Sequence, residues 1–132
     1  MKSYYLFLLL IIIFFGCQSK PDEEDCKIVA LNIILDNDSY RYYDISNLKK
    51  INAVEGTDTK NGQMFYDVES TMKITILDEC IWYPELGLKV IPPSRNFFKR
   101  ELNQSGEQFE FRKTFRFYKT ENGWRGEDNI IY

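Results

Sequence analysis

The chain of 132 residues contains no histidine. Histidine is the usual general base and a common zinc ligand, so Ser–His and Cys–His nucleophile pairs and His-ligated metal sites are excluded within this chain. Only three cysteines are present, and no two form a Cys-x-x-C motif, which argues against a thioredoxin-like redox site. Strong positive charge is also missing, because the net charge is −3. We therefore expect no catalytic motif, no cofactor, no metal and no nucleic-acid partner.

The longest uncharged apolar run lies at the N-terminus, over residues 4–15, and Lys2 is the only charge before it. Spanning ~30 Å of hydrocarbon takes about 20 apolar residues, so this run is too short for a standard transmembrane helix and is typical of a signal peptide. Gly16 and Cys17 follow at once. This pattern resembles the lipobox of bacterial lipoproteins, which implies cleavage after residues 1–16 and a diacylglycerol on the sulfur of Cys17. An ordinary secretory signal or an uncleaved anchor is the alternative.

The segment after Cys17 is polar and acidic, and residues 17–25 are expected to form a solvated tether. Its stretch 20–25 resembles the export signal of surface-exposed lipoproteins in Bacteroidota. The resemblance implies an outer-membrane lipoprotein of the cell envelope, exposed at the cell surface and held to the membrane by its lipid. Two or three acyl chains suffice as an anchor, since each buried CH₂ contributes about 0.8 kcal/mol.

If Cys17 carries the lipid, an even pair of cysteines remains, Cys26 and Cys80. An oxidising compartment permits a disulfide between them. A bridge that closes a loop of about 55 residues would stabilise the fold by roughly 4 kcal/mol on the chain-entropy model. Two buried free thiols are the alternative.

Residues 26–132 are enough for one self-sufficient core, and the aromatic content of 16% favours a sheet-rich domain. The first element is predicted to be a helix over residues 21–35, with Pro21 as its first residue and the acidic residues 22–25 in its first turn. Because the segment is short and β-branched, a strand is the competing interpretation. The apolar stripe of the predicted helix is formed by Ile28, Leu31 and Leu35 and is broadened by Val29, Ile33 and Ile34.

Strict alternation of apolar and polar residues predicts a strand over residues 64–76, interrupted only by Ser70. A second strand is expected over about 45–55. The Asn61-Gly62 pair lies between the two and is a typical hairpin turn, so we expect the two strands to pair with each other.

Residues 80–107 are irregular in pattern, with short strands expected around 88–91 and 97–102. Alternation returns over residues 109–118, where phenylalanines form one face and charged residues the other. An Asn-Gly turn then predicts a hairpin with a last strand over 124–132.

This order of elements predicts an α+β fold in which an N-terminal helix packs on a curved antiparallel β-sheet. Together with the closing segment 118–124, it resembles the small cystatin-like and NTF2-like domains. In the NTF2-like superfamily the sheet forms a pocket used for ligand binding, dimerisation or occasional catalysis. Since no catalytic motif is present, we expect a non-enzymatic binding or interaction module that meets an envelope protein or a glycan.

The segment 40–44 carries the most reactive-looking group of side chains, Tyr-Arg-Tyr-Tyr-Asp. Some NTF2-like enzymes use an aspartate base with tyrosine donors in a small apolar pocket, and Asp44 with Tyr40 and Tyr43 would imitate that site. An NTF2-like enzyme is therefore the alternative function. The simpler interpretation is a loop that enters a strand with half-buried tyrosine rings.

A basic stripe is predicted on the outward face of the terminal hairpin, from Arg112, Arg116 and Arg125, with Lys119 beside them. It would dock an acidic partner, although cross-strand ion pairs explain these residues equally well. The run 95–100 mixes basic and aromatic residues and is a second candidate binding loop for a protein or a glycan.

Overall fold

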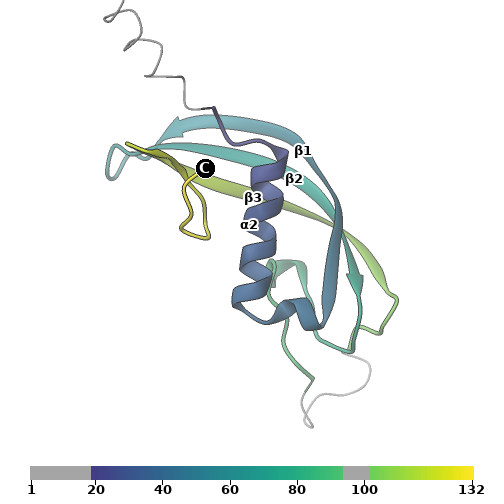
Figure 1. Cartoon of the computed structure of the whole chain (residues 1–132). Helices are drawn as coiled ribbons and strands as arrows, with labels where there is room; N and C mark the ends of the chain where they lie inside the picture. Colours follow the sequence, from purple (N-terminus) through teal and green to yellow (C-terminus); the bar gives the residue numbers. More distant parts are fainter. Residues whose placement is uncertain (1–18, 94–101) are drawn as a thin grey trace, which may run out of the picture.

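The computed structural model describes residues 19–93 and 102–132 (Figure 1). Within these ranges one α-helix lies across a four-stranded antiparallel sheet, whose strands follow the chain order β1-β2-β3-β4. The protein is therefore an α+β fold, as the sequence predicts. The elements are α2 (Glu23–Asp36), η1 (Ser39–Arg41), β1 (Tyr43–Thr57), β2 (Met64–Ile76), η2 (Pro84–Leu86), β3 (Gln108–Thr120) and β4 (Gly123–Arg125).

The helix α2 begins after Asp22 and not at Pro21. The Asp22 carboxylate accepts hydrogen bonds from the N–H groups of Glu24 (2.8 Å) and Asp25 (3.1 Å), and the Asp25 carboxylate accepts one from the Asp22 N–H (2.9 Å). This capping box satisfies N–H groups that the first turn leaves unpaired. The prediction of Pro21 as the first helical residue is wrong because Asp22 is the cap, and Pro21 is instead fully buried. The helix thus begins inside the range expected to be tether.

The face that α2 turns to the sheet agrees only in part with the predicted stripe. Ile28 and Leu35 are 39% and 56% exposed and point away from the core, whereas Val29 and Ile34 of the same stripe are buried. Both faces of this helix carry apolar residues, and helical spacing alone does not choose between them. No helix among the described residues is long and apolar enough to cross a membrane. The side chains that α2 buries are Cys26, Val29, Ala30 and Ile34.

The strand β2 lies between β1 and β3 and has the predicted bounds. Its alternation is confirmed, because every second residue from Tyr66 to Ile76 is buried on the side of α2. We call this the inner face of the sheet and the opposite side the outer face. Ser70, the expected interruption, is also fully buried in the inner row.

The strand β1 extends the expected range of 45–55 at both ends. It forms the predicted hairpin with β2 through a turn over 58–63, in which Gly62 adopts a positive φ of 71°. Two register shifts interrupt the pairing, between Ser46 and Lys49 and between Lys50 and Asn52. Irregularities of this kind bend an edge strand and make it a poor template for other chains.

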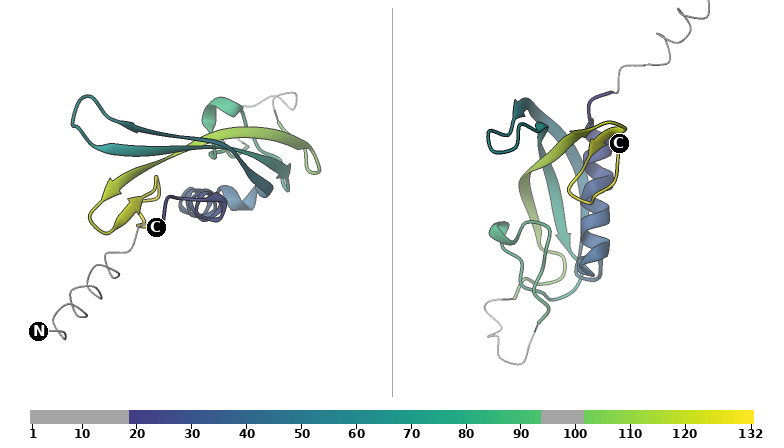
Figure 2. Two further views of the ribbon diagram at one scale, coloured as in Figure 1. Left: turned by 90° about the horizontal axis from the view of Figure 1, so that it is seen from above. Right: turned by 90° about the vertical axis from the view of Figure 1, so that its left-hand side faces the viewer.

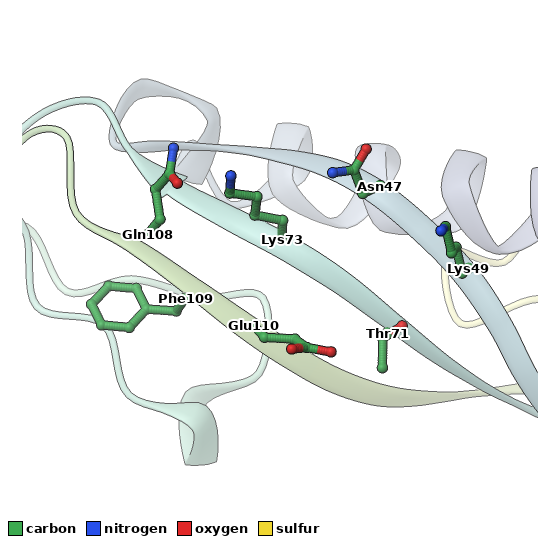
Figure 3. A pocket seen from close by; sticks show the side chains of 7 residues that line it. All are labelled: Asn47, Lys49, Thr71, Lys73, Gln108, Phe109 and Glu110. Carbon is green, nitrogen blue, oxygen red and sulfur yellow. The ribbon is translucent and has the colours of Figure 1, made fainter.

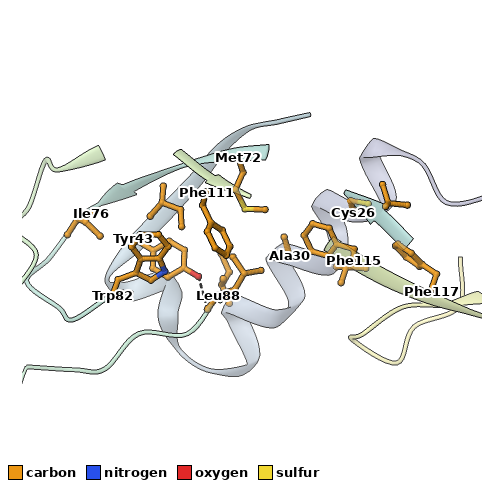
Figure 4. Packing of buried hydrophobic residues seen from close by; sticks show 14 of the residues in the cluster. Cys26, Ala30, Tyr43, Met72, Ile76, Trp82, Leu88, Phe111, Phe115 and Phe117 are labelled. Atoms are coloured by element: carbon orange, nitrogen blue, oxygen red, sulfur yellow. Dashed lines mark hydrogen bonds between the residues drawn. The ribbon is translucent and has the colours of Figure 1, made fainter. Parts of the chain in front are cut away.

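The hydrophobic core lies between α2 and the inner face (Figure 4). Phenylalanines 111, 115 and 117 of β3 provide its largest side chains from that strand, and each is at most 7% exposed. They stand opposite Val29 and Ala30 of α2, which are fully buried. A contact between large rings and small helical residues lets the helix approach the sheet closely.

The loop over residues 77–93 closes the core at the C-terminal end of α2. The ring of Trp82 lies 5.4 Å, centroid to centroid, from the ring of Phe109. The buried hydroxyl of Tyr43 donates a hydrogen bond of 2.7 Å to the carbonyl of Leu88. The expected strand over 88–91 is wrong, since only a single bridge between Ile81 and Ile91 forms there.

The end of the chain also departs from the prediction. The chain reverses near Asn129, whose φ of 64° lies in the left-handed region that asparagine tolerates. Tyr132 then pairs with Trp124 through two backbone hydrogen bonds of 2.8 and 3.0 Å. The expected last strand over 124–132 is therefore a short hairpin of its own. The expected strand over 97–102 lies, except for its last residue, outside the described residues.

Candidate functional site

The outer face of the sheet presents a polar surface built by three strands. Directly opposed residues of an antiparallel sheet point to the same side, so the strand register identifies the members of this face. One row joins Lys49, Thr71 and Arg112, and the row beside it joins Asn52, Glu69 and Thr114. The face thus alternates cations, carboxylates and neutral polar groups.

Two of the predicted surface arginines lie on this face and are held by carboxylates of β2. Arg116 makes a bidentate pair with Asp67, with N···O distances of 2.7 and 2.6 Å. The hydrogen bonds that Arg116 donates to the Asp67 carboxylate raise the pKa of Arg116. Arg112 lies 3.2 Å from a carboxylate oxygen of Glu69. The carboxylates therefore neutralise much of the predicted basic stripe, which agrees with the alternative that these arginines form cross-strand ion pairs.

The other two members of the predicted stripe lie apart from each other. Arg125 is exposed and stands opposite Tyr118, which shares the outer face with Arg116. Lys119 has the opposite parity on β3 and places its ammonium 4.8 Å from the ring centroid of Trp124. Lys119 is therefore not part of the outer face, because side chains alternate along a strand.

A shallow depression of about 360 Å³ lies on the outer face (Figure 3). Lys49 and Lys73 are not within ion-pair distance of any described carboxylate. Glu110 stands opposite Lys73 on β3 and lines the same depression, but neither lysine makes an ion pair with it like those of Arg112 and Arg116. The depression is lined by Asn47, Lys49, Thr71, Lys73, Gln108, Phe109 and Glu110.

The chemistry of the depression suits reversible binding. Two ammonium groups and two amides offer donors to an anionic or hydroxyl-rich partner, and a shallow open surface does not enclose a small substrate. The sequence pattern does not predict this site. Alternation places Lys73 on the outer face, but only the bulged register of β1 brings Lys49 beside it.

The predicted group of Tyr40, Tyr43 and Asp44 is not brought together. Tyr43 points into the core, where burial raises the pKa of its hydroxyl. Asp44 is exposed, and its carboxylate accepts the N–H of Ile45 at 2.9 Å. Because adjacent residues of a strand face opposite sides, an acid–base pair of Tyr43 and Asp44 is excluded in this fold. The alternative of an Asp–Tyr site is therefore wrong for this pair, and the simpler interpretation of a segment that enters a strand agrees with η1 and the start of β1.

A different aspartate does lie beside a tyrosine. The hydroxyl of Tyr132 donates to Asp128, which also accepts a hydrogen bond of 2.7 Å from the side-chain amide of Asn32 on α2. Burial and the bond to Asp128 raise the pKa of Tyr132. The depression on the outer face does not include these residues. The group links the end of the chain to α2.

Cys26 and Cys80 are both buried free thiols, so the disulfide that an oxidising compartment would permit is absent and the alternative of two free thiols is correct. Cys26 lies against Ser70 in the middle of β2, whereas Cys80 follows the end of that strand at Ile76. Burial raises the pKa of Cys26 to about 12 and that of Cys80 to about 11.

The lipidation candidate Cys17 and the candidate loop 95–100 lie outside the described residues. Asp22 and Asp25, in the acidic segment, form the helix cap described above. Comparison of the chain with protein-family models, curated proteins and solved structures gives no match.

Proposed function

We propose that this protein is a membrane-anchored lipoprotein of the bacterial cell envelope, with its lipid on Cys17. The observation that carries the proposal is the short apolar run over residues 4–15 that ends in Gly16-Cys17. Lys20, three residues after Cys17, contacts Glu55 on the sheet. A lipid at Cys17 would thus be attached close to the folded domain.

The proposed location is the outer membrane, with the domain at the cell surface. The acidic stretch over residues 20–25 supports this address through its resemblance to the surface-export signal of Bacteroidota lipoproteins. Asp22 and Asp25 also cap α2, so these two acidic residues have a structural role in addition to their proposed role in the export signal. Glu24 lies outside the capping pair and is exposed.

For the domain itself we propose a cystatin-like or NTF2-like relationship. A single helix laid across a four-stranded antiparallel meander supports it. The order of elements, helix first and sheet after, is the basis of the proposed relationship.

The proposed activity of the domain is non-enzymatic binding through the outer face of the sheet. Exposed Lys49 and half-buried Lys73 support this role, since both line the depression beside the amides of Asn47 and Gln108. The partner class that fits these groups is an envelope protein or a glycan that carries carboxylates or phosphates.

Metabolic labelling with an alkyne-bearing fatty acid tests the anchor. The wild-type chain is expected to take up the label, and Cys17→Ala is expected to lose it completely, because the acyl groups depend on that cysteine. Cys26→Ala is the matched control and should keep the label, since its thiol is buried in the folded domain. Equal labelling of the wild type and Cys17→Ala would refute the proposal.

A further inference from the structure

The chain is bound to the sheet from Lys20 onward. The ammonium group of Lys20 pairs with the carboxylate of Glu55 on β1 and lies 5.4 Å from the ring centroid of Tyr66 on β2. The next residue, Pro21, is fully buried. An exposed ion pair is a weak tie, so the buried proline ring and the contact with the tyrosine ring hold this segment more firmly.

The residues that follow Pro21 are also held by hydrogen bonds, so no flexible connection separates this segment from the helix. Asp22 and Asp25 form the capping box, which fixes the first turn of α2. The carboxylate of Glu23 accepts the N–H of Lys50 on β1 at 2.9 Å. From Lys20 to the first turn of α2, the chain is therefore attached to the sheet or to the helix at each step.

Only Gln18 and Ser19 separate Cys17 from Lys20. Three residue steps of at most ~3.6 Å keep the two Cα atoms within about 11 Å of each other. The strand β1, with 15 residues, is far longer, at ~50 Å when extended. A lipid on Cys17 therefore reaches one end of the domain only.

The two ends of the domain carry different parts of the chain. The end near Lys20 carries the turns over 58–63 and 120–123 and the C-terminus, and the opposite end carries the loop over 77–93 (Figure 2). We call them the anchored end and the free end. Both ends expose apolar side chains: Met64 and Ile131 are each 43% exposed at the anchored end, and Leu77 and Tyr83 are 51% and 46% exposed at the free end.

We propose that the anchored end faces the phospholipid headgroups in a fixed orientation, with the strands directed away from the bilayer and the free end outermost. This inference rests on the proposed lipidation of Cys17. Polar turns are compatible with the hydrated headgroup layer. The outer face of the sheet then stands upright on the membrane, where Lys49 and Lys73 are open to a partner that approaches from the side.

Site-specific quenching in vesicles tests this orientation. Full-length lipidated protein carrying either Lys60→Cys or Glu85→Cys is labelled with a fluorescent maleimide, since Cys26 and Cys80 are fully buried and Cys17 is blocked by the lipid. The proteins are bound to vesicles of phosphatidylethanolamine and phosphatidylglycerol that contain a nitroxide lipid. The label at position 60 is expected to lose most of its fluorescence, and the label at position 85 to keep most of it.

The matched control lengthens the tether and leaves the domain unchanged. A Gly-Ser insertion of about 12 residues between Ser19 and Lys20 adds about 20 Å of flexible chain and should remove the difference between the two labels. Equal quenching at both positions in the vesicle-bound protein without the insertion would refute the fixed orientation while the anchor stands. If the wild type floats with vesicles no better than Cys17→Ser, the anchor itself fails and the orientation falls with it.

Discussion

The two faces of the sheet differ in how their side chains are stabilised. On the inner face, β2 buries an almost uninterrupted row of apolar side chains against α2. On the outer face the same strand alternates Asp67, Glu69, Thr71 and Lys73, and two of these residues pair with arginines of β3. The inner face excludes water, whereas the outer face satisfies its charges in the presence of water. Stability should therefore reside on the inner face, which leaves the outer face available for contacts with a partner.

The largest expected effect compares one phenylalanine on each face. Phe115 is fully buried on the inner face, and Phe115→Ala should lower the free energy of unfolding by about 3–5 kcal/mol. Phe65 lies on the outer face, over Gly56 and 4.1 Å from the guanidinium of Arg116, and Phe65→Ala should cost only about 1 kcal/mol. Urea unfolding measures both. Similar losses would show that the outer face contributes as much to stability as the core.

A second effect follows from the two thiols that the core keeps protonated. Their ordinary pKa is 9.0, and burial raises it to about 12 for Cys26 and about 11 for Cys80. As the pH rises above 9, the unfolded chain releases thiol protons that the folded chain retains. The free energy of unfolding should therefore fall with rising pH, by up to about 1.4 kcal/mol per pH unit for each thiol.

Urea unfolding at about pH 8 and about pH 10 measures this loss, over the interval in which the unfolded thiols ionise first. The double variant Cys26→Ala/Cys80→Ala should show a flatter dependence on pH than the wild type, although it starts from a lower stability. An equally steep decline in the variant would assign the loss to other groups.

The smallest expected effect concerns the charges of the outer face. Asp67→Asn breaks the bidentate pair with Arg116 and should lower the free energy of unfolding by about 0.5–1 kcal/mol, because the pair is partly exposed. Lys73→Ala is the matched control on the same strand and should change stability by less than about 0.5 kcal/mol. A loss above about 2 kcal/mol for Lys73→Ala would show that this lysine has a structural role.

The elements that the sequence predicts correctly are those with one side in the hydrophobic core and the other side in water. Alternation gives β2 its bounds, since its inner residues meet the core and its outer residues meet water. The same pattern places the phenylalanines of β3 inside. Helical spacing does not identify the buried face of α2, because both faces of that helix are apolar. Alternation also fails for residues 124–132, where a turn at Asn129 replaces an extended strand.

The site residues were harder to predict because a site depends on neighbours from different strands. Arg112 and Arg116 were placed on the correct face, but the carboxylates that hold them come from β2. Tyr43 and Asp44 are adjacent in sequence, and the strand separates them onto opposite sides. Lys49 and Lys73 are 24 positions apart and meet only through the register of β1 on β2.

The sequence by itself determined the α+β class, the two long strands β2 and β3 and the candidate anchor at Cys17, because each depends on local order along the chain. The tertiary structure alone decided which residues of α2 are buried, which arginines of β3 find a carboxylate and that Cys26 and Cys80 are free thiols. These outcomes depend on how strands align and on what packs against them. That alignment is fixed by the core as a whole, so no single segment encodes it.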